Sequence, residues 1–485
     1  MADIKKQVAQ GSLAQRGLLP VTAIEQAAEL ITKVTGSDLE TVRVLFADQH
    51  GVLRGKTIVA SALPSLFTSG IAAPSTLLLK DTAHKTVFPV WSSDPGIEGD
   101  MGGAGDVLLV PDASTFRLLP WTENSAWVFC NPCYKSGDPV PFSPRGILQS
   151  AIDKLAGAGY AMTTGLEVEF HVFSIADPML EHRHSTMPGK APLTKNIAQG
   201  YQFLTETRYD TLEPIINVLR RHCQALEIPI RSMEIEMGPG QLEFTFDPAN
   251  PMTHADNMMM FRTMVKEVCA RAGLHATFMC KPKIENCAAS GWHMHQSIID
   301  IKTSENLMVP STPETLTPIA SHWIAGLLEH ATDCCLLTTP SVNGYKRYQP
   351  HQLAPDRIQW GRDNRGAMIR GLMSPSDQAS RIENRVAEPT ANPYFFFASQ
   401  ILSGLDGINR TLQAPKAVET PYDSNAPALP QSLVEAIHAF DSSTFLRREL
   451  GMTFVDYLSR IKHAEWARYH HAVSEWEQNE YFGLY

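Results

Sequence analysis

The 485-residue sequence lacks the features that mark secreted, membrane-spanning and disulfide-rich proteins. Its opening segment, MADIKKQVAQGSLAQRG, has no apolar core of the kind found in a signal peptide. No stretch approaches the ~20 apolar residues that a membrane helix needs. Eight cysteines in so long a chain are too few for a disulfide framework. We therefore expect a cytoplasmic protein without a membrane partner.

The usual signatures of zinc sites and of nucleotide-binding loops are also missing. Cys130 and Cys133 form a lone CxxC, and the adjacent Cys334 and Cys335 have the wrong spacing to complete a zinc site. No GxxxxGK[ST] motif occurs, and the glycines of SSDPGIEGDMGGAGD (92–106) do not follow a strand with GxGxxG spacing. We therefore expect reduced, packed thiols, a surface loop at 92–106, and neither a P-loop nor a Rossmann site.

Composition and charge narrow the class of protein further. Apolar residues make up 44% and charged residues 19%, as in ordinary globular proteins. The net charge of -10 argues against a nucleic-acid partner, because the phosphate backbone requires a basic surface. At roughly 100–200 residues per domain, the length indicates two to four domains.

Turn and helix signals predict where the chain divides. Two β-rich runs within 41–60 flank a turn at Gln49-His50-Gly51, which predicts a hairpin. The segment SGDPVPFSP (136–144) resembles a linker, and Ser143 followed by Pro144 is typical of a capped helix start. We therefore predict an N-terminal helical segment at 1–35 and domains at 36–140 and 141–485. Further helices are predicted at about 253–272, 321–337, 391–409, 431–441 and 453–480, an α+β pattern.

Four short segments alternate like strands and place polar residues of catalytic types on one face. Taken singly, each fits a half-buried strand with a solvated outer face. If the strands are neighbours, however, so many carboxylates would repel one another unless cations lay among them. Hard cations such as Mg²⁺ or Mn²⁺ prefer oxygen ligands. The polar positions are Glu167, Glu169 and His171; Glu236, Gln241, Glu243 and Thr245; His293, His295 and Ser297; and Arg381, Glu383 and Arg385.

A basic cluster follows in the segment 343–370. It contains Lys346, Arg347, Arg362, Arg365 and Arg370. Alone it would read as a basic surface loop. Arginine offers a planar fork that matches carboxylate and phosphoryl oxygens. If the cluster lies beside a sheet of carboxylates that binds metal ions, the combination indicates phosphoryl transfer as the chemistry.

At these residues the sequence resembles the glutamine synthetase superfamily. The resemblance extends over about residues 35–460 in the family order, and the N-terminal runs GDVLLVPD (105–112) and LLPW (118–121) also fit. Any single motif would be weak, but together they are highly specific. The motifs are GLEVEF (165–170), EIEMGPGQLEF (234–244), ATFMCKP (276–282), SGWHMHQS (290–297), NGYKR (343–347), NRGAMIR (364–370) and RIENRVAEPTANPY (381–394).

The resemblance implies an N-terminal β-grasp domain, a catalytic domain with a curved antiparallel sheet, and a ring-shaped homo-oligomer, often a dodecamer of two hexameric rings. It implies two Mg²⁺ or Mn²⁺ ions, with Glu169, Glu236 and Glu243 as ligands of one and Glu167, His293 and Glu383 as ligands of the other. It also implies that His295, Ser297, Arg370 and Arg381 hold ATP. Arg347, Arg365 and Arg385 would hold glutamate and the transferring phosphate.

The implied reaction has two steps. ATP phosphorylates the γ-carboxylate of glutamate, and an amine then displaces phosphate to form an amide. Phosphorylation is needed because a carboxylate is a poor electrophile. Metal ions and arginines would offset the repulsion between the two anionic substrates.

Two departures from the family pattern bear on the amine. Where ammonia-using members carry a glutamate after the YKR segment, this chain has Leu353, and the run before His293 reads Ala288-Ala289-Ser290-Gly291-Trp292. We expect Trp292, Leu353 and Tyr201 to line the acceptor pocket. An apolar pocket favours an aromatic or alkyl amine such as aniline.

This pattern is similar to the branch that contains γ-glutamylanilide and γ-glutamylpolyamine synthetases. A polyamine would require extra carboxylates to pair with its distal ammonium. The alternatives are an ordinary glutamine synthetase that uses ammonia and a non-catalytic structural relative, which predicts eroded metal ligands. All six ligand positions are intact.

Overall fold

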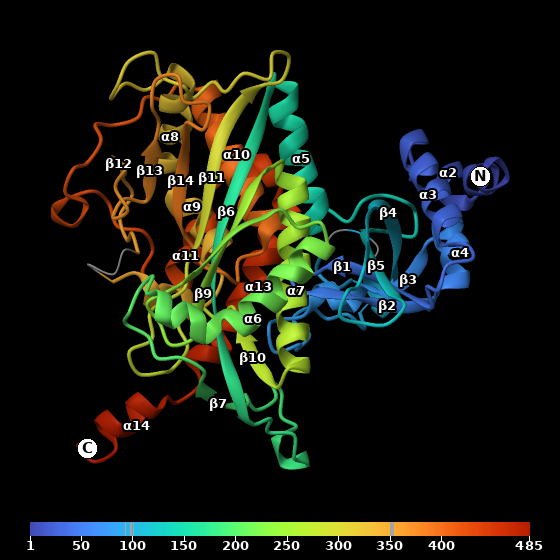
Figure 1. Ribbon diagram of the computed structural model, residues 1–485, viewed down its shortest axis with the longest axis horizontal. Helices are drawn as coiled ribbons and strands as arrows, with labels where there is room; N and C mark the ends of the chain where they lie inside the picture. The colour runs from blue at the N-terminus through green and yellow to red at the C-terminus, as the bar shows by residue number, and fades with distance from the viewer. Residues whose placement is uncertain (93, 98, 100, 350–353) are drawn as a thin grey trace.

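A computed structural model describes the chain from residue 1 to 485 apart from residues 93, 98, 100 and 350–353. Leu353 therefore lies outside the described residues. The structure contains two β-sheets, each packed against helices (Figure 1). Within the described residues, no helix combines the length and the apolar character needed to cross a bilayer.

The smaller sheet has five strands in the order β2-β1-β5-β4-β3. The hairpin predicted within 41–60 is confirmed as β1 and β2, which pair in antiparallel fashion. The Asp48 carboxylate closes its turn by accepting hydrogen bonds from the backbone N–H groups of His50 (2.9 Å) and Val52 (3.0 Å). The strands are β1 (Thr41–Ala47), β2 (Leu53–Val59), β3 (Ile71–Pro74), β4 (Asp106–Leu118) and β5 (Ser125–Cys133).

The larger sheet has nine strands, seven of them in the order β12-β13-β14-β11-β6-β9-β8, with β7 and β10 paired to the distal part of β6. All pairs are antiparallel except β12 with β13. The four segments predicted as strands are confirmed, and they lie beside one another in this sheet. The strands are β6 (Tyr160–Asp177), β7 (Leu193–Asn196), β8 (Ile230–Ile235), β9 (Gln241–Ala249), β10 (Leu274–Thr277), β11 (Trp292–Asp300), β12 (Trp360–Arg362), β13 (Ile369–Leu372) and β14 (Arg381–Ala387).

Helices α5 (Pro144–Gly157), α7 (Pro251–Arg271) and α10 (Pro393–Asn409) cover one face of the larger sheet (Figure 1). The apolar alternating positions of the strands meet these helices. Phe170 packs edge-on and Phe244 packs at a tilt against Phe261 of α7, and Trp292 packs against Phe396 of α10. Because successive side chains of a strand point to opposite faces, this core leaves the other face of the sheet to the polar positions.

The helical predictions hold with two corrections. The runs expected at 321–337 and 453–480 are each two helices: the first is interrupted at His330, and the second at 471–474, where Ser474 forms a capping box with Glu477. The α-helices are α1 (Ala2–Ala9), α2 (Ser12–Gln15), α3 (Val21–Val34), α4 (Leu63–Ser69), α5 (Pro144–Gly157), α6 (Glu206–Ala225), α7 (Pro251–Arg271), α8 (Pro318–Glu329), α9 (Ala331–Thr338), α10 (Pro393–Asn409), α11 (Leu433–Ser442), α12 (Thr444–Leu450), α13 (Met452–His470) and α14 (Glu475–Tyr481).

The start of α5 also differs from expectation. Ser143 is the N-cap residue, but its side chain makes no capping hydrogen bond. The fixed backbone angle of Pro144 therefore begins this helix without help from the serine hydroxyl. The division of the chain at residue 140 stays a prediction, with the smaller sheet before it and the larger sheet after it.

A buried arginine joins the two sheets. Arg145 of α5 binds both oxygens of Asp256 in α7, at 3.0 and 2.8 Å, and also Asp112 of β4 at 2.9 Å. The Arg145 side chain is almost fully buried. Removing one partner of a buried ion pair leaves the other as an uncompensated charge.

We predict that Arg145→Ala lowers the free energy of unfolding by about 3–5 kcal/mol, because Asp256 would keep its charge in a buried position. Urea denaturation followed by fluorescence would measure the shift. Lys5→Ala is the matched control, since it breaks an exposed ion pair with Glu25 and should cost below about 1 kcal/mol. Equal effects of the two substitutions would contradict the prediction.

Candidate active site

Strand register brings the predicted acidic residues together. Across β6 and β11, Glu167 lies opposite His293. Across β6 and β9, Glu169 lies opposite Glu243. Across β11 and β14, His295 lies opposite Glu383. Residues directly opposite have Cβ atoms only about 4.5–5.5 Å apart, so these pairings concentrate carboxylates and imidazoles on one patch of the sheet.

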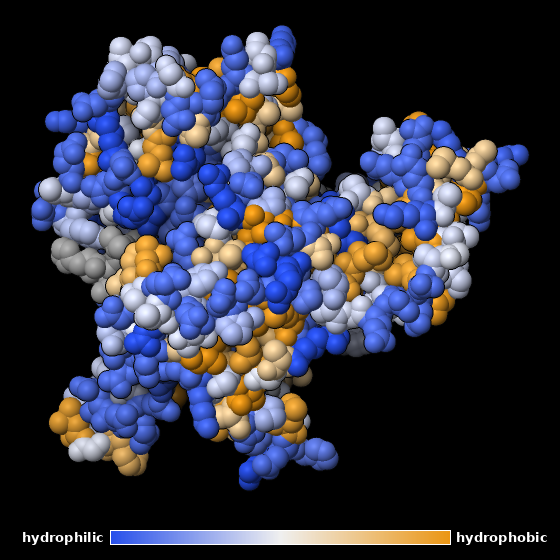
Figure 2. All heavy atoms as spheres, viewed as in Figure 1, coloured by the Kyte–Doolittle hydropathy of each residue, from blue (hydrophilic) through white to orange (hydrophobic). Residues whose placement is uncertain are grey.

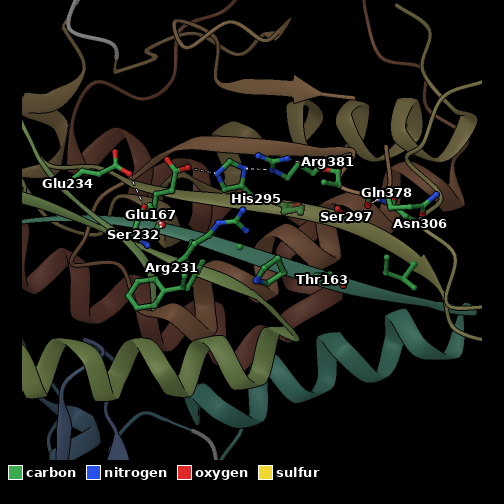
Figure 3. A pocket seen from close by; sticks show the side chains of 18 residues that line it. Thr163, Glu167, Arg231, Ser232, Glu234, His295, Ser297, Asn306, Gln378 and Arg381 are labelled. Atoms are coloured by element: carbon green, nitrogen blue, oxygen red, sulfur yellow. Dashed lines mark hydrogen bonds and ion pairs between the residues drawn. The ribbon is translucent and has the colours of Figure 1, made fainter. Parts of the chain in front are cut away.

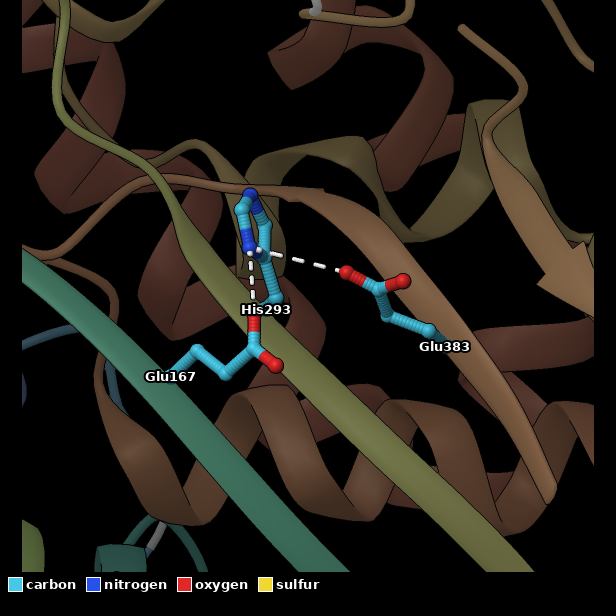
Figure 4. A group of neighbouring side chains, drawn as sticks. All are labelled: Glu167, His293 and Glu383. Atoms are coloured by element: carbon cyan, nitrogen blue, oxygen red, sulfur yellow. Dashed lines mark hydrogen bonds and ion pairs between the residues drawn. The ribbon is translucent and has the colours of Figure 1, made fainter. Parts of the chain in front are cut away.

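The first group that could hold a cation consists of Glu167, His293 and Glu383 (Figure 4). One ligand atom from each lies within 4.8 Å of the others. His293 Nδ1 is 3.2 Å from Glu167 Oε2 and 3.6 Å from Glu383 Oε1. This is the set that the sequence predicted for one of the two metal ions.

The second group shares His293 with the first. Glu169 Oε1 lies 3.8 Å from His293 Nε2, and Glu243 Oε1 lies 3.9 Å from His293 Nδ1. The structure therefore brings five of the six predicted ligands into two groups. The sixth, Glu236, follows β8 and is close enough for its charge to act on Glu243, but it does not belong to either group.

The pKa values within this cluster report strong repulsion between carboxylates. Burial and the charge of Glu169 raise the pKa values of both Glu236 and Glu243. Glu167 behaves differently: burial opposes its ionisation, but hydrogen bonds with His293 and His295 outweigh that effect and lower its pKa. Within the cluster, the environment thus favours ionisation of Glu167 and opposes ionisation of Glu236 and Glu243.

The donor set fits divalent cations. His293 Nε2 is buried and has no hydrogen-bond partner among the residues that the structure describes, although a buried polar atom normally has one. A cation among these carboxylates would reduce their repulsion and let Glu236 and Glu243 ionise. Carboxylate oxygens with one imidazole are the donors expected for Mg²⁺ or Mn²⁺.

Arginines surround the carboxylates on the β14 side. Arg385 forms an ion pair with Glu383, and Arg370 donates to the other oxygen of Glu383 at 3.1 Å. Burial opposes ionisation of Glu383, but the charges of Arg385, His293 and His295 together outweigh it and lower the pKa. Arg381 Nε donates to His295 Nδ1 at 3.1 Å, so His295 Nε2 carries the proton that it shares with Glu167 at 2.8 Å.

Arg347 is placed beside His293 by a glycine. A Cβ on Gly291 would lie 2.5 Å from Arg347 Nη2 and 3.1 Å from His293 Nε2, so only glycine allows this approach. Arg347 is buried, whereas Arg365 is exposed and contributes its carbonyl oxygen to Arg385 Nε at 3.1 Å. Two of the three arginines expected to hold the acid substrate therefore lie at the cluster.

A cavity of about 600 Å³ opens beside the carboxylates (Figure 3). Three of the four residues expected to hold ATP line it: His295, Ser297 and Arg381. Arg370 is not among the lining residues and instead contacts Glu383 and Asp363. The motifs assigned no role to five further polar side chains of this cavity, all of which except Glu234 lie outside the matched motifs. These are Arg231, Ser232, Glu234, Asn306 and Gln378.

The structure places the residues expected to line an amine pocket in different environments. Trp292 is fully buried against Phe396 and Phe397, on the face of the sheet opposite to His293. That expectation is corrected, because a strand that points His293 toward the carboxylates must point its neighbour into the core. Tyr201 is 71% exposed, and its N–H donates to Met237 O at 2.8 Å, next to Glu236. Leu353 lies outside the described residues.

We predict that divalent cations stabilise the protein more as the pH rises. The raised pKa values of Glu236 and Glu243 mean that the metal-free folded state binds more protons than the unfolded state, so its stability falls as the pH rises above the ordinary carboxyl value of 4.5. A cation binds the ionised carboxylates and reverses this trend. Thermal unfolding with Mg²⁺ or with EDTA at pH 6, 7 and 8 would measure the difference, with Glu243→Gln as the control. A cation effect that stays constant or shrinks over this range would contradict the prediction.

Comparisons with known proteins agree with this geometry. The family profile described as glutamine synthetase, catalytic domain, matches residues 141–481. The chain is 38% identical over 480 residues to a γ-glutamylanilide synthase of Acinetobacter sp., covering 95% of this chain and 96% of that protein. It is 29% identical over 458 residues to a glutamate–isopropylamine ligase of Pseudomonas sp., covering 92% and 96%.

A solved structure of GmaS without ligand superposes with a TM-score of 0.78 at 26% identity, covering 93% of this chain and 99% of that one. The α+β architecture is thus that of a known glutamine synthetase-like enzyme. The family match spans more than half of the chain, and the residues that converge on His293 lie within it. The chain belongs to the glutamine synthetase family.

Proposed function

We propose that the protein is an ATP-dependent γ-glutamyl ligase that joins glutamate to an organic amine through γ-glutamyl phosphate. The observation that carries this proposal is the convergence of Glu167, Glu169, Glu243 and Glu383 on His293. So many carboxylates on one patch suit metal-assisted phosphoryl transfer. One relative is named for an anilide product and the other for isopropylamine as the amine that it ligates, and both names favour an aromatic or alkyl amine as acceptor.

Two divalent cations, Mg²⁺ or Mn²⁺, would be held at this patch. Glu167, His293 and Glu383 would bind one, and Glu169, Glu236 and Glu243 the other. When bound, such ions neutralise the negative charge of phosphoryl oxygens. The protein's own contribution is the strand register, which holds the ligands at fixed positions before any substrate arrives.

ATP would occupy the cavity in Figure 3. Its volume of about 600 Å³ lies within the ordinary range for small-molecule sites. Glu167 lines the cavity and also belongs to the first cation group, so the nucleotide's phosphates would end at the metals. His295, Ser297 and Arg381 line the same wall, and Arg370 would reach the phosphates from β13.

Arginines would hold the acid substrate and the phosphoryl group in transfer. Arg347 and Arg385 flank His293, and Arg365 lies on the neighbouring loop. Guanidinium forks bind carboxylate and phosphoryl oxygens in a fixed orientation. This placement would bring the γ-carboxylate of glutamate to the end of the nucleotide and offset the charge that develops during transfer.

The acceptor amine would enter beside Tyr201 and Glu236. Tyr201 is exposed at the edge of the cluster, with its backbone bound to Met237. An aromatic side chain at an open edge can cover the apolar part of an amine and stabilise it by burial. We include Leu353 in this proposal on sequence grounds alone.

Turnover with a panel of amines tests the acceptor. With glutamate, ATP and Mg²⁺, we expect phosphate release together with a γ-glutamyl product mass for aniline or short alkylamines. Because an apolar pocket gains about 0.8 kcal/mol for each buried CH₂ group, kcat/KM should rise several-fold for each added methylene until the pocket is full. Glu243→Gln is the inactive control, since it removes a cation ligand while keeping its shape. Strong turnover with ammonium and none with organic amines would identify an ordinary glutamine synthetase and overturn the proposed acceptor.

We further propose that the protein assembles as a homo-oligomer, a dodecamer of two hexameric rings. The support comes from α14 and the residues after it, which project from the body and expose Trp476, Phe482 and Leu484 (Figures 1 and 2). Among the described residues, Glu475 of α14 forms an ion pair with the exposed Lys283 of the body. An aromatic surface of this kind is typical of a subunit interface.

We predict that removing residues 472–485 reduces the assembly to smaller particles, because the apolar contacts of α14 would be lost. Light scattering coupled to size-exclusion chromatography would measure the mass of the full and shortened chains. Val21→Ser, which changes an exposed apolar residue at the start of α3, is the control and should leave the mass unchanged. A full chain that runs as a monomer would contradict the proposed assembly.

A further inference from the structure

A chain of buried polar side chains runs behind the carboxylate cluster and ends on Glu169. Gln241 Nε2 lies 3.1 Å from Glu169 Oε2 and 3.0 Å from Ser290 Oγ. Ser290 Oγ lies 3.2 Å from His171 Nδ1, and His171 Nε2 lies 3.2 Å from Cys287 Sγ. These contacts link β6, β9 and the loop before β11 in one continuous path.

The orientation of the Gln241 amide is fixed at both ends. Its oxygen accepts the backbone N–H of Gly238 at 2.8 Å, so its nitrogen must face Glu169 and Ser290. That nitrogen has two protons. One goes to the Glu169 carboxylate, which only accepts, and the other goes to the Ser290 hydroxyl oxygen.

The directions of the remaining hydrogen bonds along the path then follow from that of Gln241. Ser290 Oγ accepts a hydrogen bond from Gln241 Nε2, so its own hydroxyl proton is free to point at His171 Nδ1. A neutral His171 that accepts at Nδ1 carries its proton on Nε2 and donates it to Cys287 Sγ. The thiol proton can reach Ala288 O at 3.4 Å. Every polar atom along the path thus has a partner with a matching role.

The site leaves no room for water to replace these contacts. His171 and Ser290 have no exposed surface, and Gln241 is 1% exposed. A Cβ on Gly238 would lie 2.6 Å from Gln241 Oε1 and 2.9 Å from His171 Nε2. Buried polar groups without partners cost free energy, so breaking one link leaves its neighbours unsatisfied and free to turn.

The two oxygens of Glu169 are thereby given different roles. Gln241 binds Oε2, while Oε1 faces His293 Nε2, 3.8 Å away, within the second cation group. We propose that His171, Ser290 and Gln241 are positioning residues that hold the Glu169 carboxylate in the orientation needed to bind a divalent cation with Glu236 and Glu243. This rests on the proposed function, because it assumes that the patch holds metal ions.

The test measures Mn²⁺ binding to the Ser290→Ala variant by electron paramagnetic resonance in the absence of nucleotide. The wild-type protein should bind two Mn²⁺ ions. The substitution removes the middle link with little change in volume, and loss of such an outer contact typically weakens metal binding about 10–100-fold. We expect that loss at one site, with the site of Glu167, His293 and Glu383 unchanged.

Ser399→Ala is the matched control. Ser399 is also a fully buried serine, but its hydroxyl donates to Phe396 O within α10 and lies outside the path. It should bind both Mn²⁺ ions as the wild type does. His171→Phe is a second variant that keeps a planar ring while removing both hydrogen bonds, and it should weaken the same single site. All proteins would be compared below their unfolding midpoints.

The outcomes separate the two proposals. If the wild type binds two ions and both Ser290→Ala and His171→Phe still bind them as tightly, the positioning role is overturned. Equal weakening of both sites, or weakening of the same size in Ser399→Ala, would also overturn it. A wild type that binds fewer than two ions would instead remove the two-metal centre of the proposed function.

Discussion

Repulsion among carboxylates on one face of the larger sheet is the constraint on which the site depends. The pairing of β6 with β9 and β11 forces Glu167, Glu169 and Glu243 together. The protein partly offsets the repulsion with His293 and Arg385, and it leaves Glu243 with a raised pKa. Such a face would be a liability in a purely structural sheet, and it becomes useful once cations and a polyphosphate share it.

The alternating pattern allowed most of this face to be predicted from sequence. A two-residue period places Glu167 and Glu169 on the same side, and the same rule sends Trp292 to the side opposite His293. The expectation that Trp292 lines the acceptor pocket is wrong because closeness in sequence to a ligand does not imply closeness to the substrate. Within a strand the opposite holds, because the side chain next to a ligand points away from the site.

Other features could not be read from single positions. The cavity beside the cluster takes Arg231 from β8 and Gln378 from the loop before β14, which only the folded sheet brings to one place. The break between α8 and α9 at His330 has no proline and no glycine at the interruption itself, and the nearest glycine, Gly326, lies within α8. There the His330 ring stacks on Phe445 and binds Asp406 at 2.8 Å, so tertiary contacts override a continuous helical pattern.

The 18-residue strand β6 limits how this enzyme can diversify. It pairs with β9 and β11 over its first part and with β7 and β10 over its second part. Sliding it by one position would turn Glu167 and Glu169 inward and Phe170 outward, exchanging active site for core along its whole length. New substrate preferences must therefore arise in the loops at the rim of the sheet, where insertions leave the strands in place.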